Sequence, residues 1–237
     1  IQAYRAEVLP QVGALIEQPA LYGYMSGRDN LRAFATALGG VAEQRIDEVL
    51  EIVALKGRQK DRVRTYSLGM KQRLGIAVAL LHDPQLLILD EPANGLDPAG
   101  IVEMRDFLHR LVDAGKTILI SSHLLAEVQQ ICTRVAIINF GKLVAETSLE
   151  DLTKGAGDFK VAVERPAEAL ALIKSQTWGS QAYIDEAGYV ITPSPDGQGR
   201  GLIAFLSHFG FVPDSVSPAE RNLEQVFLQL TNGVTGI

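Results

Sequence analysis

Cysteine is nearly absent from this sequence, since Cys132 is the only one among 237 residues. No disulfide can therefore form within the chain, and a reducing, cytosolic setting fits. No apolar run approaches the roughly 18 residues that a membrane-spanning helix needs, so the sequence is not expected to be a transmembrane channel. The first ten residues, IQAYRAEVLP, contain no basic segment followed by an apolar stretch, so no signal peptide is visible.

An excess of positive charge is missing as well. The chain has 22 lysines and arginines against 28 aspartates and glutamates, a formal net charge of −6, which argues against a protein that mainly coats nucleic acid phosphates. Hydrophobic residues make up 47% and charged residues 21%, which is the composition of a globular protein. The first residue is Ile and not Met, so we expect the sequence to begin inside a longer protein.

The pattern of residues 1–155 predicts an α/β fold. Continuous apolar runs typical of buried strands occur at 85–90 and 117–123, and a further strand is expected at 134–140. Helices are predicted over roughly 98–114 and 124–131. Because strands and helices alternate, we expect a mostly parallel sheet with helices on both faces.

Two other regions differ from this core. Amphipathic helices that contain Leu31 and Ile46 predict a helical subdomain, at about 26–82. The character changes again near Gly157, after which short strands alternate with helices near 166–175, 199–209 and 222–230. Residues 156–237 are therefore predicted to form a small C-terminal α+β extension.

Two acids follow the apolar run LLIL in the segment LLILDEP, at 86–92. A buried strand that ends in Asp90 and Glu91 presents two carboxylates at the carboxyl edge of a sheet, where ligands of open α/β folds bind. Asp90 is then the candidate for holding Mg²⁺, and Glu91 the candidate for polarising a water that attacks a phosphate. The alternative is that the acids only cap the next turn.

Three neighbouring segments favour the chemical interpretation. YSLGM places Ser67 and Gly69 at a helix start, where free N–H groups and the helix dipole favour an anion, although Ser67 could be only an N-cap. NGLDP supplies Asp97 in a tight turn, whose alternative role is to begin a helix at Pro98. SSH places His123 at the end of the next strand, where a lone histidine is more often a surface residue.

These segments, in this order, resemble the nucleotide-binding subunit of ATP-binding-cassette (ABC) transporters. YSLGM is similar to the signature motif, LLILDEP to the Walker B segment, NGLDP to the D-loop, and His123 to the switch histidine. The resemblance covers roughly residues 8–155 and implies an ABC-type P-loop NTPase core, here an incomplete nucleotide-binding domain. The tail, which ends in NLEQVFLQLT, resembles the extension of drug- and bacitracin-exporter ATPases.

The resemblance implies a dimer and a membrane partner. Members of the family pair head to tail around two ATP molecules, so Ser67 and Gly69 are expected to contact the γ-phosphate on the opposite subunit. Asp97 would link the two sites. A transmembrane permease subunit would contact the 17–22 loop and the helices at 28–55. The chain would then be cytoplasmic and peripheral on the inner face of the cell membrane.

The resemblance also implies roles at the phosphate. Asp90 would organise Mg²⁺, Glu91 would act as general base, and His123 would hold the γ-phosphate and the attacking water. Glu17, with Gln18 next to it, takes the place of the glutamine that senses Mg²⁺ and the membrane partner. Glutamate there is similar to the bacitracin-exporter branch.

One family motif is missing from these residues. The phosphate loop, Gly-x-x-x-x-Gly-Lys-Ser/Thr (Walker A), does not occur. Gly115-Lys116-Thr117 follows a predicted helix and has Arg110 where the first glycine belongs, so we interpret it as a helix C-cap. The stacking aromatic for adenine is also missing. The 237 residues by themselves are therefore expected to bind ATP very weakly and to hydrolyse none.

Three functional hypotheses are compatible with these motifs, and the motifs favour them unequally. The leading hypothesis is the energy-coupling ATP-binding subunit of an exporter. The alternative is a non-catalytic subunit that completes a partner's ATP site through Ser67 and Gly69, although such a subunit need not keep Asp90, Glu91 and His123. A cassette ATPase of translation or DNA repair is a third option, but those typically carry two cassettes or a long coiled coil. The transported substrate does not follow from the sequence.

Overall fold

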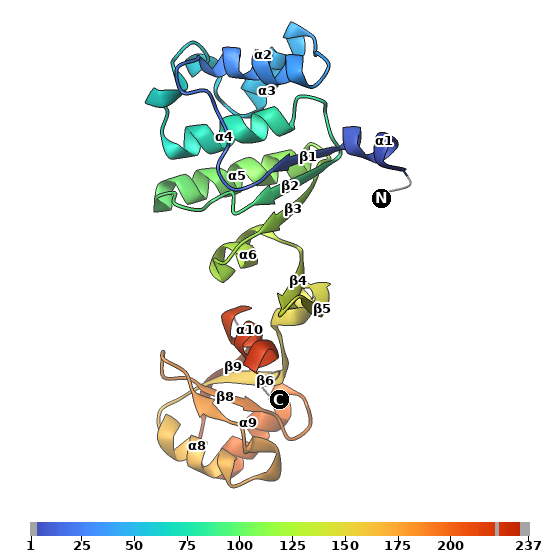
Figure 1. The fold of residues 1–237 in the computed structure, drawn as a ribbon. Helices are drawn as coiled ribbons and strands as arrows, with labels where there is room; N and C mark the ends of the chain where they lie inside the picture. Colours follow the sequence, from blue (N-terminus) through green and yellow to red (C-terminus); the bar gives the residue numbers. More distant parts are fainter. Residues whose placement is uncertain (1–3, 221–222, 233–237) are drawn as a thin grey trace. The chain divides into compact units, whose positions relative to one another are not determined.

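A computed structural model describes residues 4–220 and 223–232 (Figure 1). The chain divides into two compact units, of which the first ends at Ile131 and the second begins at Cys132. The domain boundary expected between residues 155 and 156 stays a prediction. None of the described helices is both long and apolar enough to cross a membrane.

The first unit is built on a three-stranded parallel sheet. The strands are β1 (Val12–Leu15), β2 (Leu86–Asp90) and β3 (Thr117–Ser121), in the order β1-β2-β3. The chain enters the sheet through α1 (Arg5–Val8) and the 3-10 turn η2 (Leu9–Gln11). In the parallel register, Asp90 at the end of β2 lies opposite Ser121 at the end of β3. The α/β prediction for this region is confirmed.

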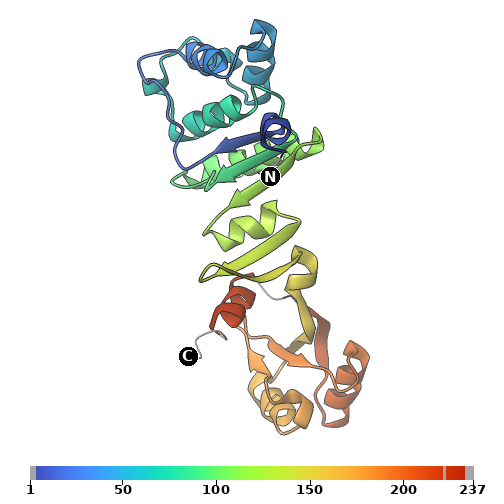
Figure 2. The same ribbon diagram turned by 45° about the vertical axis from the view of Figure 1, so that its right-hand side comes forward.

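Helices α4 (Leu68–Ala79) and α5 (Pro98–Asp113) pack against the sheet, as Figures 1 and 2 show from two directions. Their apolar sides share a fully buried core with Leu87 and Leu89 of β2. The packing of β1 on α4 is so close that a Cβ on Gly13 would lie 2.4 Å from the carbonyl oxygen of Ala79. Only glycine allows this approach.

The opposite face of the sheet is exposed. Register pairs Ala14 with Ile88 and Ile88 with Leu119 in one row across the three strands. Leu119 is 58% exposed and Ile88 is 37% exposed. Our expectation of helices on both faces is therefore wrong for the described residues, because α4 and α5 both pack on the face that carries Leu87 and Leu89.

A group of helices between β1 and α4 confirms the two helices predicted there. They are α2 (Gly27–Ala37) and α3 (Glu43–Ile52), followed by the 3-10 turns η3 (Lys56–Arg58) and η4 (Val63–Thr65). Leu31 and Ile46 are buried in the same core as Leu74 of α4. Ser26 caps α2 by accepting a hydrogen bond from the amide of Asp29 at 3.1 Å. The limits of a helical subdomain at 26–82 stay a prediction.

Helix α6 (Leu125–Ile131) ends the first unit, and an antiparallel hairpin of β4 (Arg134–Asn139) and β5 (Lys142–Ser148) begins the second. An α+β arrangement follows the hairpin, as predicted. Its elements are α7 (Leu149–Thr153), β6 (Lys154–Val163), α8 (Pro166–Lys174), η5 (Thr177–Gly179), β7 (Tyr183–Ile184), β8 (Val190–Pro193), α9 (Gly199–His208), β9 (Pro213–Glu220) and α10 (Leu223–Asn232).

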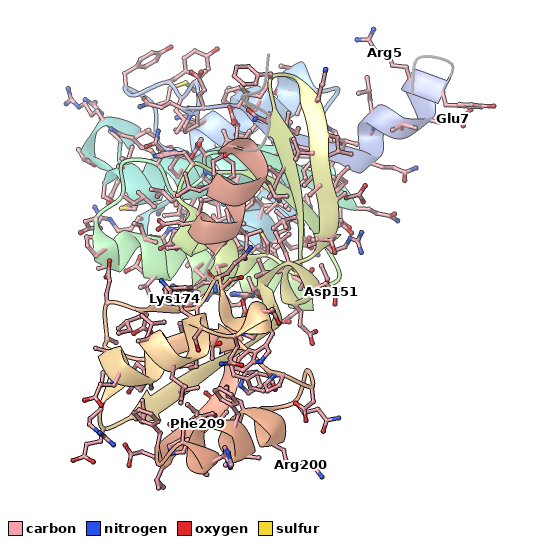
Figure 3. All side chains as sticks on the ribbon, turned by 90° about the horizontal axis from the view of Figure 1, so that it is seen from below. Arg5, Glu7, Asp151, Lys174, Arg200 and Phe209 are labelled. Atoms are coloured by element: carbon pink, nitrogen blue, oxygen red, sulfur yellow. The ribbon has the colours of Figure 1, made fainter. Side chains whose placement is uncertain are left out.

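The sheet of the second unit is antiparallel, with the order β7-β8-β6-β9, and from β6 to β9 the chain follows a β-α-β-β-α-β path. Its core is separate and includes Val161, Ile173 and Leu202. Figure 3 shows Arg200 pointing away from α9. The predicted last helix began at residue 222, which lies outside the described residues.

Candidate functional site

Two carboxylates stand at the carboxyl edge of β2, as predicted. The apolar residues LLIL form the strand, and Asp90 is its last residue. Glu91 follows with a φ of 48°, in the left-handed region that residues other than glycine rarely adopt. This conformation turns the chain out of the strand direction, so the strand ends at Asp90 and Glu91 does not continue it.

The imidazole of His123 joins this edge from the neighbouring strand. His123 comes two residues after Ser121, the last residue of β3. Its Nδ1 lies 2.9 Å from Oε1 of Glu91, and the imidazole N–H donates to the carboxylate. The His123 side chain is 61% exposed and that of Glu91 is 26% exposed, so a ligand can reach both.

A third residue, which the sequence analysis missed, ties the acids together. The hydroxyl of Ser121 donates to Oδ1 of Asp90. The same Oγ accepts from the backbone N–H of Glu91 at 3.1 Å, and the carbonyl oxygen of Ser121 accepts from that N–H at 3.2 Å. Ser121 belongs to the same SSH segment as His123, but its contact with the acids could be predicted only from the parallel register, which places Ser121 opposite Asp90.

Both predicted helix starts are capped by their own side chains. Ser67 accepts from the amide of Met70 at 3.2 Å at the start of α4, and Gly69 lies in the first turn. Asp97 accepts from the amide of Gly100 at 2.9 Å at the start of α5. Ser67 and Asp97 are therefore both N-caps of their helices. An N-cap does not exclude a role toward phosphate, because the remaining free N–H groups of the first turn still favour an anion.

The two helix starts lie against each other. A Cβ on Gly69 would be 3.7 Å from Cδ2 of Leu96, and one on Gly95 would be 3.2 Å from Cδ2 of Leu68. The YSLGM and NGLDP segments of this chain are thus neighbours in space.

Glu17 is not brought into contact with the acids. It is exposed, it follows β1 and it has a φ of 52°. Since β1 pairs with β2, Glu17 lies at the same edge of the sheet, but no hydrogen bond joins it to Asp90 or Glu91 in the part of the chain that the structure describes.

Gly115-Lys116-Thr117 is a helix end and not a phosphate loop. Gly115 has a φ of 86° after the last residues of α5, and its N–H donates to the carbonyl of Val112 at 2.8 Å. Lys116 pairs with Asp83 at 2.8 Å, and this hydrogen bond lowers the pKa of the Asp83 carboxyl. The C-cap interpretation is confirmed.

The carboxylates at this edge are not joined by enough further ligands to form a permanent metal site among the described residues. Among the described residues there is no group of three or more His, Cys, Asp or Glu side chains that could hold a metal. Mg²⁺, however, usually keeps several waters and is bound by one or two carboxylates together with substrate phosphates. Asp90 beside Glu91 therefore fits an Mg²⁺ ion that arrives with a nucleotide, and does not fit a permanent metal site.

Comparison with known proteins gives consistent matches. A sequence profile described as ABC transporter matches residues 3–94. The bacitracin transport ATP-binding protein BcrA of Bacillus licheniformis is 39% identical over 233 residues, which are 98% of this chain and 76% of the relative. YdbJ of Bacillus subtilis, an uncharacterized ABC transporter ATP-binding protein, is 38% identical over 95% of this chain and 72% of its own length.

Other relatives match a shorter part. YhcH of Bacillus subtilis, also an uncharacterized ABC transporter ATP-binding protein, is 48% identical over 71% of this chain, and the match spans only 56% of YhcH. A solved structure described as the ATP binding subunit of an ABC transporter is 32% identical, with a TM-score of 0.50, and the match covers 60% of this chain and 61% of that one.

Proposed function

This chain belongs to the ABC transporter family of ATP-binding proteins, and from that membership we propose that it is the ATP-binding subunit of an exporter. In this proposal, ATP binding closes a dimer, and hydrolysis reopens it and drives a membrane partner. The observation that carries the proposal is the hydrogen bond between His123 and Glu91, beside Asp90, at the carboxyl edge of β2 and β3. Export is supported by relatives named for bacitracin and lantibiotic transport.

The three side chains divide the work at the terminal phosphate. A bound Mg²⁺ would supply neutralisation of phosphate charge, with Asp90 as its protein ligand. Glu91 takes a proton from the attacking water as general base. His123 orients Glu91 through the 2.9 Å hydrogen bond, and its exposed imidazole is free to turn to the γ-phosphate when a nucleotide is present.

The remaining candidates act across the dimer or toward the membrane. Ser67 and Gly69 would meet the γ-phosphate of ATP bound to the opposite subunit, and Asp97 would link the two sites. The permease would contact the loop that contains Glu17 and the helices at 28–55. Near that loop, Ile16 is 74% exposed and Tyr24 is 72% exposed, which suits an apolar protein contact. Such a contact would hold the chain at the inner face of the membrane.

These 237 residues contain no Gly-x-x-x-x-Gly-Lys-Ser/Thr segment, so we expect the chain alone to bind ATP very weakly. Charge-assisted hydrogen bonds to phosphate contribute roughly 1.5–3 kcal/mol each, and several would be lacking. Micromolar affinity in a calorimetric titration of the 237-residue chain would contradict this expectation.

The second candidate function is a non-catalytic subunit that lends Ser67 and Gly69 to a partner. Adding the chain to an active family member and measuring ATPase separates the two.

The test of the main proposal is Glu91→Gln in the protein expressed from its gene together with its permease. ATP turnover should fall at least about 100-fold, and an ATP-bound dimer should accumulate, because the base is lost while the shape of the site is kept. Glu186→Gln, in an exposed turn of the second unit, is the matched control and should leave turnover unchanged. Normal turnover in Glu91→Gln would show that the base assignment is wrong.

A further inference from the structure

We infer that Ser121 is a positioning residue for the acid pair, because its hydroxyl fixes both the carboxylate of Asp90 and the backbone of Glu91. The inference rests on the proposed function, in which these acids hold the metal and activate water. Ser121 is the last residue of β3, and the register places it directly opposite Asp90, the last residue of β2. The position of the hydroxyl therefore follows from strand pairing and not from a flexible loop.

One hydroxyl serves both acids. A serine hydroxyl has one proton to donate and two lone pairs that accept. Ser121 donates to Oδ1 of Asp90 and accepts from the N–H of Glu91 at 3.1 Å. The two bonds use different capacities of the same oxygen, so they do not compete.

The bond to Glu91 acts on a strained backbone. Glu91 has a φ of 48°, a conformation that costs free energy for any residue with a Cβ and persists only where the surroundings hold it. Its N–H is held twice by Ser121, through Oγ and through the carbonyl oxygen at 3.2 Å. With this backbone, the carboxylate of Glu91 reaches Nδ1 of His123. Removing the hydroxyl would leave only the carbonyl to hold the amide.

The bond to Asp90 fixes the rotation of its carboxylate. Because Oδ1 accepts from Ser121, the plane of the carboxylate is defined and Oδ2 remains for water or a metal ligand bond. Partners that orient a ligating carboxylate typically change metal affinity or activity about 10- to 100-fold when they are removed. Ser121 touches no reacting atom in this arrangement, so its effect passes through Asp90 and Glu91.

The experiment compares Ser121→Thr with Ser121→Val in the protein expressed from its gene. The two side chains have the same shape and both suit a strand, but only threonine keeps the hydroxyl. Ser121 is exposed at the end of β3, so a branched side chain meets no closed core there. Thermal midpoints of the two variants should agree with each other.

The first measurement is hydrogen exchange of the Glu91 amide, resolved by fragmentation mass spectrometry without nucleotide. Exchange should be roughly 2- to 10-fold faster in Ser121→Val, which corresponds to the loss of one hydrogen bond, and unchanged in Ser121→Thr. The Leu89 amide, inside the β2 ladder, should exchange equally in both.

The second measurement is ATP turnover with the permease, where kcat of Ser121→Val should fall about tenfold or more while KM for ATP stays within about twofold.

Glu91→Gln, measured in parallel, distinguishes a failure of the base assignment from a failure of the role of Ser121. If Glu91→Gln retains normal turnover, the proposed role of Glu91 as general base fails, and with it the catalytic part of this inference. If Glu91→Gln abolishes turnover but Ser121→Val equals Ser121→Thr in exchange or in kcat, the role of Ser121 alone is overturned. Faster exchange together with lower kcat in Ser121→Val only, and rescue by threonine, supports it.

Discussion

Nδ1 of His123 lies 2.9 Å from Oε1 of Glu91, and the two residues follow neighbouring parallel strands. Since His123 is 61% exposed, the pair sits at the surface of the sheet edge and not in the core. Removing the imidazole should therefore change chemistry without creating a cavity, which makes this contact a clean point at which to test the site.

For His123→Ala we expect ATP turnover, measured with the permease, to fall at least about 100-fold, because the imidazole that orients Glu91 is lost. The free energy of unfolding should change by less than about 0.5 kcal/mol, as is usual for exposed positions. His109→Ala is the matched control, since His109 lies exposed on α5, where its Nε2 is 3.3 Å from the backbone oxygen of Gln130. Equal turnover in the two variants would contradict the role of His123.

Gly69→Ala tests the approach of phosphate to the start of α4. A Cβ at this position would meet only Leu96 at 3.7 Å, an ordinary contact, so the variant should fold and gain up to about 1 kcal/mol from helix propensity. If Gly69 faces a γ-phosphate in the dimer, ATPase should nevertheless fall more than about tenfold. Gly57→Ala serves as the control because a Cβ there meets no atom within 4 Å. Unchanged ATPase in Gly69→Ala would refute a phosphate contact.

Asn30 should determine the conformation of the loop before α2. Its fully buried amide accepts from the N–H of Tyr22 at 2.8 Å and donates to the carbonyls of Tyr22 at 3.1 Å and Ser26 at 2.9 Å. In Asn30→Asp the donor is lost and a charge is buried, so the free energy of unfolding should decrease by about 2–3 kcal/mol. Chemical denaturation measures this, with Gln44→Glu at an exposed position of α3 as the control. A loss below that of the control would show that the three bonds matter little.

The ion pairs between α2 and α3 predict a dependence of stability on pH. Hydrogen bonds from Arg32 and then Arg28 lower the pKa of the Glu43 carboxyl from 4.5 to about 2. Because the folded pKa is the lower one, Glu43 stabilises the fold fully above about pH 4.5 and loses this contribution as pH falls toward 2. The pKa of Asp47 is lowered too, chiefly by its hydrogen bond from Arg28.

Thermal midpoints measured from pH 6 to 2 check this prediction. The advantage of the unchanged protein over Glu43→Gln should shrink steadily below about pH 4.5. Glu164→Gln, exposed in the second unit, should show no such trend. A difference between the protein and Glu43→Gln that stays constant over the whole range would contradict the lowered pKa.

Much of the fold could be predicted from local patterns. The apolar run at 85–90 corresponds to β2 (Leu86–Asp90), and the helix predicted over 98–114 corresponds to α5 (Pro98–Asp113). The α/β class and the family were predictable because four short motifs occur in the right order, and both are confirmed by the comparisons. Hydrophobic periodicity and turn residues act within a few positions of the chain, so the sequence displays them directly.

The features that the sequence did not predict depend on the pairing of segments that are distant in the chain. A run such as LLIL does not show that Leu87 is covered by helices while Ile88 is 37% exposed on the other face. Nor does SSH show that Ser121, and not only His123, meets the acids, since this depends on the register of β2 against β3. The roles toward ATP and Mg²⁺ stay predictions for every candidate: Ser67, Gly69, Asp97, Glu17, Asp90, Glu91 and His123.

The described residues contain two hydrophobic clusters with no member in common, one around Leu87 and the other around Val161. A substitution that destabilises the first cluster need not unfold the second, because each cluster is formed by its own helices and strands. Changes to the segment from β6 onward can therefore be made without touching the cluster around Leu87.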